Sequence, residues 1–446
     1  MKSNLKLIFP AAFALFFFSL IHHIGYARQS SHALLADTLN DKIENVSTSV
    51  QILSRLKISG YLQAQWQKAD TAGISSFSGG NFPKHSNNRF GVRRGRVKFT
   101  YEHELSAFVV QLDATEKGIG IKDAYIAIHE PWFEFVTLTA GIFDRPFGYE
   151  ISYSSSVRET PERSRMFQTL FPGERDLGAK ITLQPRKGTR FDFIKLDAGL
   201  FAGNGVNAEF DSRLDFIGRI GISKANKAEN FKYGFGLSYY HGGVLQGTRF
   251  VYTTCIMTDG VTKGFNVDST STNLNKFAHR QYLGIDIQLS LFSVIGLTSL
   301  RAEYIKGKQP GGKNSNMSIA SGTAPNYDTY LRIFGGGYIY FIQNIGQSKH
   351  QFAIKYDWLD PNVKVAGYDI ELNNSEGLST SLSAADIGYY TLGFGWNYRF
   401  NSHTKFTAYY EIVRNEITSL PGPNSTNNYT KDLKDNVLTL RVQYKF

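Results

Sequence analysis

The chain has 446 residues and a single cysteine, Cys255, so disulfides cannot hold the fold together and a cysteine-based zinc site is excluded. It is rich in Phe (34), Tyr (25) and Gly (42) but poor in Met (4) and Pro (12), which favours antiparallel β-structure of the kind a membrane barrel needs. The net charge of +11 suggests nucleic acid, an acidic surface or small anions as partners.

The N-terminus has the pattern of a secretory signal peptide. Lys2 and Lys6 precede an apolar run over residues 7–21, and small residues lead to a cleavage site after Ala27. We expect residues 1–27 to be removed, with cleavage after Ala36 as the alternative, and removal lowers the net charge from +11 to +9. No later stretch approaches eighteen apolar residues, so no transmembrane helix is predicted. Export argues against nucleic acid as a partner.

Residues 28–55 are predicted to be a leader in front of the main domain. Within it, Ile43, Val46, Val50 and Leu53 follow at helical spacing. The stretch is therefore either a short periplasmic helix, which could serve oligomerisation, or a loosely structured leader.

Residues 56–446 are dominated by alternating strands bounded by Gly, Asn, Ser and Pro turns. Short turns and long loops alternate along the chain, as in outer-membrane barrels. An even number of strands near sixteen implies an aqueous channel rather than a packed interior. The predicted fold is therefore all-β, a 16-stranded antiparallel transmembrane β-barrel. The sixteen predicted strands are 56–68, 89–103, 105–115, 119–130, 133–143, 176–184, 190–202, 212–225, 230–243, 277–291, 293–307, 329–343, 348–360, 386–400, 402–417 and 434–446.

The two faces of each strand differ in polarity. In 388–400, Phe394 and Trp396 share one face, and Thr391, Asn397 and Arg399 share the other. A soluble β-sandwich would show the same period, with its apolar face turned inward. The closing strand, however, ends on a terminal aromatic residue, which resembles the assembly signature of outer-membrane barrels. Together with the signal peptide, this ending favours the membrane barrel.

The long loop 144–175 interrupts the strand pattern. It carries five arginines and five acidic residues, and a loop of this length is normally either functional or disordered. Its aromatic and aliphatic residues, such as Phe147, Phe167 and Phe171, argue against disorder. We expect the loop to fold into the mouth or lumen of the barrel and to narrow the pore. An external loop folded on itself is the alternative.

Alternation also sorts the charged residues of the strands. If the apolar faces meet lipid, the lumen receives fourteen Lys and Arg, including Lys405, Arg441 and Lys445, against eight Asp and Glu. Such a basic lumen favours anions, and guanidinium groups bind phosphate oxygens bidentately. The alternative is a ladder of ion pairs that braces the wall. The predicted pore and anion-binding residues are Arg94, Arg96, Lys98, Arg145, Arg158, Arg163, Arg165, Lys180, Arg219 and Arg399.

Arg94, Arg96 and Lys98 form the sharpest cluster among these residues. At strand spacing they share one face, about 6.6–6.8 Å apart, so an anion could move from one to the next. The alternative is that they pair with Asp113 or Asp123 on adjacent strands.

No motif for catalysis occurs in the sequence. It lacks a phosphate-binding loop, an H-E-x-x-H motif and a nucleophile elbow. The histidines are scattered without the spacing of metal ligands, and Asp357 and Asp360 beside Pro361 are more typical of turn caps than of a calcium site. We therefore predict no enzymatic activity, no cofactor and no metal.

Three segments resemble a known family. The stretches 93–99 (RRGRVKF), 120–126 (GIKDAYI) and 141–150 (GIFDRPFGYE), with the terminal Tyr-Lys-Phe, are similar to the phosphate-selective porin O/P family, in particular its Bacteroidota-type outer-membrane porins. The resemblance implies a sixteen-stranded barrel, a homotrimer and an inward-folded constriction loop. It also implies selection of phosphate or pyrophosphate by inward arginines and a lysine cluster. The lysine-rich loop of the family is not found in this chain.

The sequence therefore predicts a porin of the bacterial outer membrane. It would let small solutes diffuse passively, prefer anions such as phosphate, contact outer-membrane lipid and form a homotrimer. Two alternatives remain open. One is a structural or adhesive surface barrel with a plugged pore, and the other is a secreted soluble β-sandwich.

Overall fold

The computed structural model describes residues 41–47, 50–371 and 379–446. The chain divides into two compact units, residues 1–57 and 58–446, and each is considered by itself. In the first unit, residues 41–47 and 50–54 are helical. The predicted signal peptide lies outside the described residues. No helix in the described ranges has the length and apolarity needed to cross a membrane.

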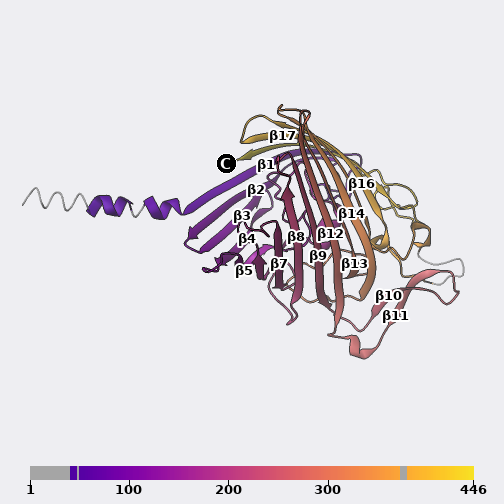
Figure 1. The fold of residues 1–446 in the computed structure, drawn as a ribbon. Helices are drawn as coiled ribbons and strands as arrows, with labels where there is room; N and C mark the ends of the chain where they lie inside the picture. Colours follow the sequence, from indigo (N-terminus) through magenta and orange to yellow (C-terminus); the bar gives the residue numbers. More distant parts are fainter. Residues whose placement is uncertain (1–40, 48–49, 372–378) are drawn as a thin grey trace, which may run out of the picture. The chain divides into compact units, whose positions relative to one another are not determined.

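The main unit is a closed antiparallel barrel of sixteen strands (Figure 1). Neighbours in sequence pair with each other, β9 pairs with β12, and β1 pairs with both β2 and β18. The barrel strands are β1 Leu56–Ala69, β2 Asn88–His103, β3 Ser106–Thr115, β4 Gly118–His129, β5 Val136–Asp144, β6 Arg175–Leu183, β7 Ile194–Phe201, β8 Asp215–Ala225, β9 Phe231–Leu245, β12 Phe277–Ser293, β13 Gly296–Gly311, β14 Thr329–Asn344, β15 His350–Asp360, β16 Tyr389–Arg399, β17 Thr404–Asn415 and β18 Val437–Lys445. All sixteen predicted strands are confirmed, and closure excludes the sandwich.

One hairpin lies where the sequence predicts only a loop. Strands β10 (Val251–Ile256) and β11 (Lys263–Asp268) pair with each other inside the segment 244–276. β10 also runs parallel to the start of β14, with Val251 opposite Thr329. Each strand has six residues, too short for a barrel-spanning pattern, so alternation over about ten residues overlooks them.

The exposure of the side chains confirms the predicted faces. On β16 the outward Phe394 is 44% exposed and Trp396 38%, whereas the inward Thr391 and Asn397 are buried. A soluble protein would bury such aromatic rings, but lipid is the solvent outside a membrane barrel. The outer wall is therefore apolar and the inner wall polar.

Among the apolar clusters that lie away from this outer wall, two are large. One joins the loop after β5, which contains helix α2 (Arg165–Leu170), to inward side chains of β9 and β12–β14. The other lies among the long loops and includes Phe265, Val365, Ile370 and Leu420. The long loops thus have an apolar core of their own.

Removing one ring from the first cluster tests how firmly the loop is held. Phe171 is fully buried, with its ring 5.0 Å from that of Phe147 and 5.7 Å from that of Tyr282. We expect Phe171→Ala to cost about 3–5 kcal/mol and to raise hydrogen exchange across residues 145–174. Phe133→Ala, at a ring 70% exposed, is the control and should leave exchange unchanged. Equal protection of residues 145–174 from hydrogen exchange in both variants would contradict this packing.

Candidate functional site in the barrel lumen

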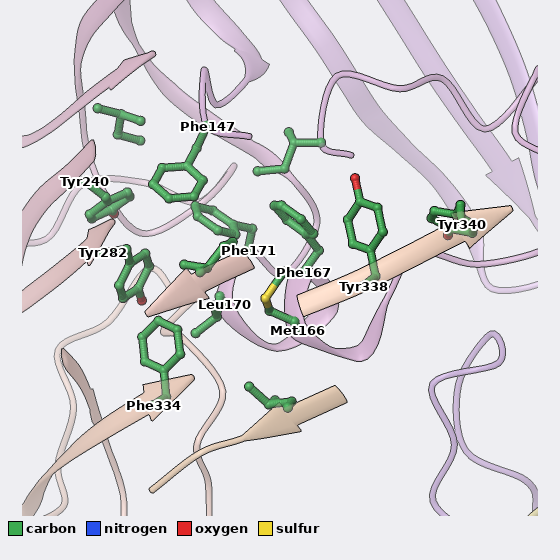
Figure 2. Close-up of a cluster of buried hydrophobic side chains, with 14 of the residues drawn as sticks. Phe147, Met166, Phe167, Leu170, Phe171, Tyr240, Tyr282, Phe334, Tyr338 and Tyr340 are labelled. Carbon is green, nitrogen blue, oxygen red and sulfur yellow. The ribbon is translucent and has the colours of Figure 1, made fainter. Parts of the chain in front are cut away.

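One side of the 145–174 loop is fixed by aromatic packing (Figure 2). Phe147 and Phe171 of the loop pack against Tyr282 on β12, and Phe171 also packs against Tyr240 on β9. The rings of Tyr240 and Tyr282 lie 5.0 Å apart, and Phe167 lies 6.3 Å from Tyr338 on β14. Fully burying each such side chain contributes about 1.5–3 kcal/mol, so this contact anchors the loop to one part of the wall.

Gly148 lets the loop approach this wall closely. Its φ is +65°, and its N–H donates to Ser238 Oγ at 2.9 Å. A Cβ at this position would clash with the carboxylate of Glu303 on β13. The other oxygen of Glu303 accepts from Tyr149 N at 3.1 Å and from Tyr338 Oη at 3.0 Å. Only glycine combines this backbone conformation with the space available.

The opposite side of the loop is polar and contacts the rest of the wall. Tyr61 on β1 bonds Ser155 at 2.6 Å, Asn397 on β16 donates to Glu159 O at 2.9 Å, and Lys405 on β17 donates to Arg158 O at 2.8 Å. The loop therefore meets inward-facing side chains from both sides of the barrel.

Glu162 is the centre of this polar contact. Its side chain is 3% exposed, and its carboxylate forms ion pairs with Arg93 at 2.9 Å, Arg94 at 2.7 Å and Arg441 at 2.9 Å. Burial alone would raise the pKa of Glu162, but the surrounding arginines outweigh burial and hold its pKa well below the usual range. One acidic side chain of the loop thus neutralises charge on β2 and β18.

Arg93 is a lumen residue that alternation misses. Arg93 and Arg94 are adjacent in sequence, yet both side chains reach Glu162. Arg89 also turns inward and donates to Gln67 Oε1 and to Gly80 O. The alternation of β2 therefore changes phase between Arg93 and Arg94, as happens at a β-bulge. The Arg-Arg pair in a strand is the one signal that could have revealed it.

Six of the ten predicted pore residues are held in ion pairs. For the Arg94, Arg96 and Lys98 row, pairing with Asp113 is right for Arg96, whereas Asp123 pairs with Arg175 instead. Arg94 and Arg96 of this row are therefore paired. The six pairs are Arg94–Glu162 at 2.7 Å, Arg96–Asp113 at 2.9 Å, Arg145–Asp176 at 3.0 Å, Arg163–Glu174, Lys180–Asp197 at 3.8 Å and Arg219–Asp286 at 2.7 Å.

The other four, Lys98, Arg158, Arg165 and Arg399, have no ion pair with any residue in the described ranges. Arg158 is 2% exposed, and its Nε and Nη1 atoms have no hydrogen-bond partner there. Arg165 lies between the rings of Phe77 and Tyr389, at 4.5 and 3.9 Å. Among the predicted residues, these four keep charge that is not already neutralised.

A cavity of about 230 Å³ opens at the short-turn end of the lumen. Arg399, Lys405 and Lys445 line it together with Ser156 and Gln443, and none of its described lining residues is acidic. Alternation places Lys405 and Lys445 in the lumen but does not single them out. Their gathering depends on the pairing of β16, β17 and β18.

Metal binding receives no support from the described residues. They contain no group of three or more His, Cys, Asp or Glu side chains that could hold a metal ion. Asp360 Oδ1 accepts from Asn362 N at 2.9 Å, so it caps the turn, as the sequence suggests.

The substitution Glu162→Gln tests the ion pairs between Glu162 and its three arginine partners. The change leaves the buried guanidinium groups of Arg94 and Arg441, and the partly exposed one of Arg93, without their counter-charge. We therefore expect it to lower the free energy of unfolding by about 3–5 kcal/mol. Because the folded-state pKa of Glu162 is depressed, its contribution is fully present above the unfolded pKa of about 4.3 and is lost as the pH falls through the folded pKa.

The measurement is thermal unfolding of both proteins between pH 7 and pH 3. The Tm difference should be constant from pH 7 to about 5 and should shrink below about 4. Glu134→Gln, at an exposed acid that pairs with Arg186 outside the lumen, is the control. A Tm difference that did not change with pH would rule out an ionised Glu162 paired with the arginines.

Comparison with known proteins agrees with this architecture. Residues 87–248 match the family model for phosphate-selective porins O and P. No curated protein matches the sequence. Among solved structures, the anion-selective porin from Comamonas acidovorans is 8% identical with a TM-score of 0.52, and the match covers 88% of this chain and 99% of that chain. The outer membrane channel DcaP of Acinetobacter baumannii is 10% identical with a TM-score of 0.49, covering 88% and 97%.

The Comamonas structure shows that the fold is that of a porin barrel. The family match falls on the segment that contains all three motifs on which the predicted resemblance depends. That resemblance is thereby confirmed: residues 87–248 match the phosphate-selective porin O and P family, and the barrel has a porin-type fold.

Proposed function

We propose that the protein is a passive diffusion channel of the bacterial outer membrane that prefers small anions. The observation that carries the proposal is the cavity at the short-turn end, which Arg399, Lys405 and Lys445 line without any acidic partner among the described residues. Cations that are not neutralised lower the electrostatic barrier to an anion at that mouth. The anion-selective porin from Comamonas acidovorans has the same fold.

The 145–174 loop acts as the constriction in this proposal. It contacts β1, β16 and β17 on one side and packs on β9, β12 and β14 on the other, so a solute must pass beside it. Two guanidinium nitrogens of Arg158 have no hydrogen-bond partner among the described residues, and the Arg158 carbonyl accepts a hydrogen bond from Lys405, which lines the cavity.

Phosphate is the solute that the family match favours. Guanidinium groups hold phosphate through two parallel hydrogen bonds, whereas ammonium groups act as point charges. This mouth has two lysines and one arginine, which suits general attraction of anions better than tight geometric selection. Homotrimeric assembly follows from the family resemblance and belongs to the same proposal.

A structural or adhesive barrel with a plugged pore is the second candidate. It is favoured by the amount of apolar side chain that the loop inserts among inward strand residues (Figure 2). The separate apolar core of the long loops gives such a barrel a stable outer surface. Conductance separates the two candidates.

The reversal potential of the purified protein in a planar bilayer under a tenfold KCl gradient tests the channel. We expect it to favour chloride. Replacing Arg399, Lys405 and Lys445 with Gln should move it towards cations by roughly 20 mV, within the limit of about 59 mV for a monovalent ion. Replacing Arg94, Arg96 and Lys98 with Ala should move it less, because Arg94 and Arg96 are already paired.

The matched control replaces Lys187, Lys224 and Lys227 with Gln. These are three exposed lysines that do not line the cavity. Addition of inorganic phosphate then tests selection, because block of the chloride current would support a phosphate site. Cation preference of the wild type would contradict the proposal. Absence of conductance would favour the plugged barrel.

A further inference from the structure

Two lysines lie on the outer wall of the barrel instead of in the lumen. On β13, Glu303 and Ile305 are buried and face inward, and Tyr304 is 42% exposed on the outward face. Lys306 and Lys308 continue the outward face, and Lys306 is exposed. A lysine facing lipid costs about 2–4 kcal/mol at the midplane of the membrane and about 0–1 kcal/mol near its surfaces. Their height in the wall therefore decides what surrounds them.

Both lysines lie near the long-loop end of β13. From Ile295 in the short turn to Lys306 the chain advances 11 positions, which corresponds to roughly 28 Å across the membrane for a tilted strand. The apolar band of such barrels is about 25 Å tall. Tyr304, two residues before Lys306 on the same face of β13, stacks on Trp358 with the ring centroids 6.4 Å apart, as in an aromatic girdle. The lysines therefore lie at the level of lipid headgroups.

Strand register places polar side chains on the β12 side of Lys308, whereas Ile333 lies opposite it on β14. Lys308 lies opposite Gln281 on β12, and Gln281 lies opposite His241 on β9. Gln281 Nε2 and His241 Nδ1 are 3.1 Å apart. Lys306 lies opposite Leu283, one step below this row. On β9, β12 and β13 the outward side chains thus change from apolar to polar and basic at the row of His241, Gln281 and Lys308.

An apolar groove of about 380 Å³ joins this basic patch. Tyr239, Leu283 and Ile333 line it together with both lysines. A second outer groove, of about 400 Å³, runs past Trp66 and Trp396, but its one basic residue, Arg441, is bound to Glu162 in the lumen. The groove on β12–β14 is therefore the one of these two that combines an apolar surface with unneutralised cations.

No counter-charge from the described part of the chain satisfies the lysines. Neither ammonium group makes an ion pair or hydrogen bond with a residue in those ranges. Gly335 on β14 lies opposite Lys306 on one side and opposite Asp360 of β15 on the other. The Oδ1 atom of Asp360, however, accepts a hydrogen bond from Asn362 N. The patch therefore attracts an anion from outside the chain.

We infer that Lys306 and Lys308, with Gln281 and His241, bind the phosphate group of a membrane lipid whose acyl chain lies in the groove. Lysine ammonium groups attract lipid phosphate as point charges, and Gln281 adds a hydrogen-bond donor. A free phosphate would gain nothing from the apolar groove, whereas a lipid fills the groove and pairs both lysines. The inference requires an embedded barrel but does not depend on anion passage.

The test compares two lipids with identical acyl chains, dimyristoyl phosphatidic acid and dimyristoyl glycerol. Each is added to the full-length protein, freed of bound lipid in detergent, and the complexes are counted by native mass spectrometry. We expect the phosphatidic acid to bind and the double variant Lys306→Gln and Lys308→Gln to weaken binding at least tenfold. The control, Lys224→Gln with Lys227→Gln, removes two exposed lysines near a short turn and should bind like the wild type.

Three results would overturn the inference. Equal binding of dimyristoyl glycerol would make the groove merely apolar. Displacement of the lipid by equimolar inorganic phosphate would make the patch a site for free anions. Loss of oligomers in the double variant without added lipid would make the patch an interface between copies of the chain. Conductance and reversal potential of the variant should equal those of the wild type, which shows that it folds and separates this inference from the proposed function.

Discussion

The pairing of the first strand with the last one is the constraint on which the rest of this structure depends. Gly60 and Phe446 exchange backbone hydrogen bonds of 3.1 and 3.0 Å, and β1 then follows β18 residue by residue from Tyr61 to Ala69. A sheet embedded in lipid cannot leave an edge open, because each unsatisfied backbone group there costs several kcal/mol. Closure fixes which face of every strand meets lipid and which face encloses the lumen.

Closure also creates a polar interior in which a long loop can be held from several sides. The loop after β5 uses aromatic packing on one side and charge pairing on the other. Apolar packing alone would leave the arginines of β2 and β18 buried without partners, and Glu162 removes that penalty for three of them. Such buried pairs add little net stability, but breaking one is costly, so they fix the position of the loop.

The same residue types have three different roles because of where they lie. Arg94 and Arg441 are neutralised by Glu162 and brace the loop. Lys405 and Lys445 line a cavity without acidic partners, where their charge remains available to a solute. Lys306 and Lys308 face outward at the level of lipid headgroups. A count of lumen charges cannot distinguish these roles, because the field at a solute depends on which charges remain unpaired.

The sequence by itself determined the barrel: the number of strands, their spans and their faces follow from a period of two, which is a local property that lipid enforces on every strand. It also marked the 144–175 loop and its arginines as notable. The tertiary structure decided which of those arginines are paired. Glu162 lies 68 positions from Arg94, and the two meet only because the loop folds back onto β2. Likewise, the phase change at Arg93, the short hairpin β10–β11 and the gathering of Arg399, Lys405 and Lys445 depend on contacts between strands, which local alternation does not encode.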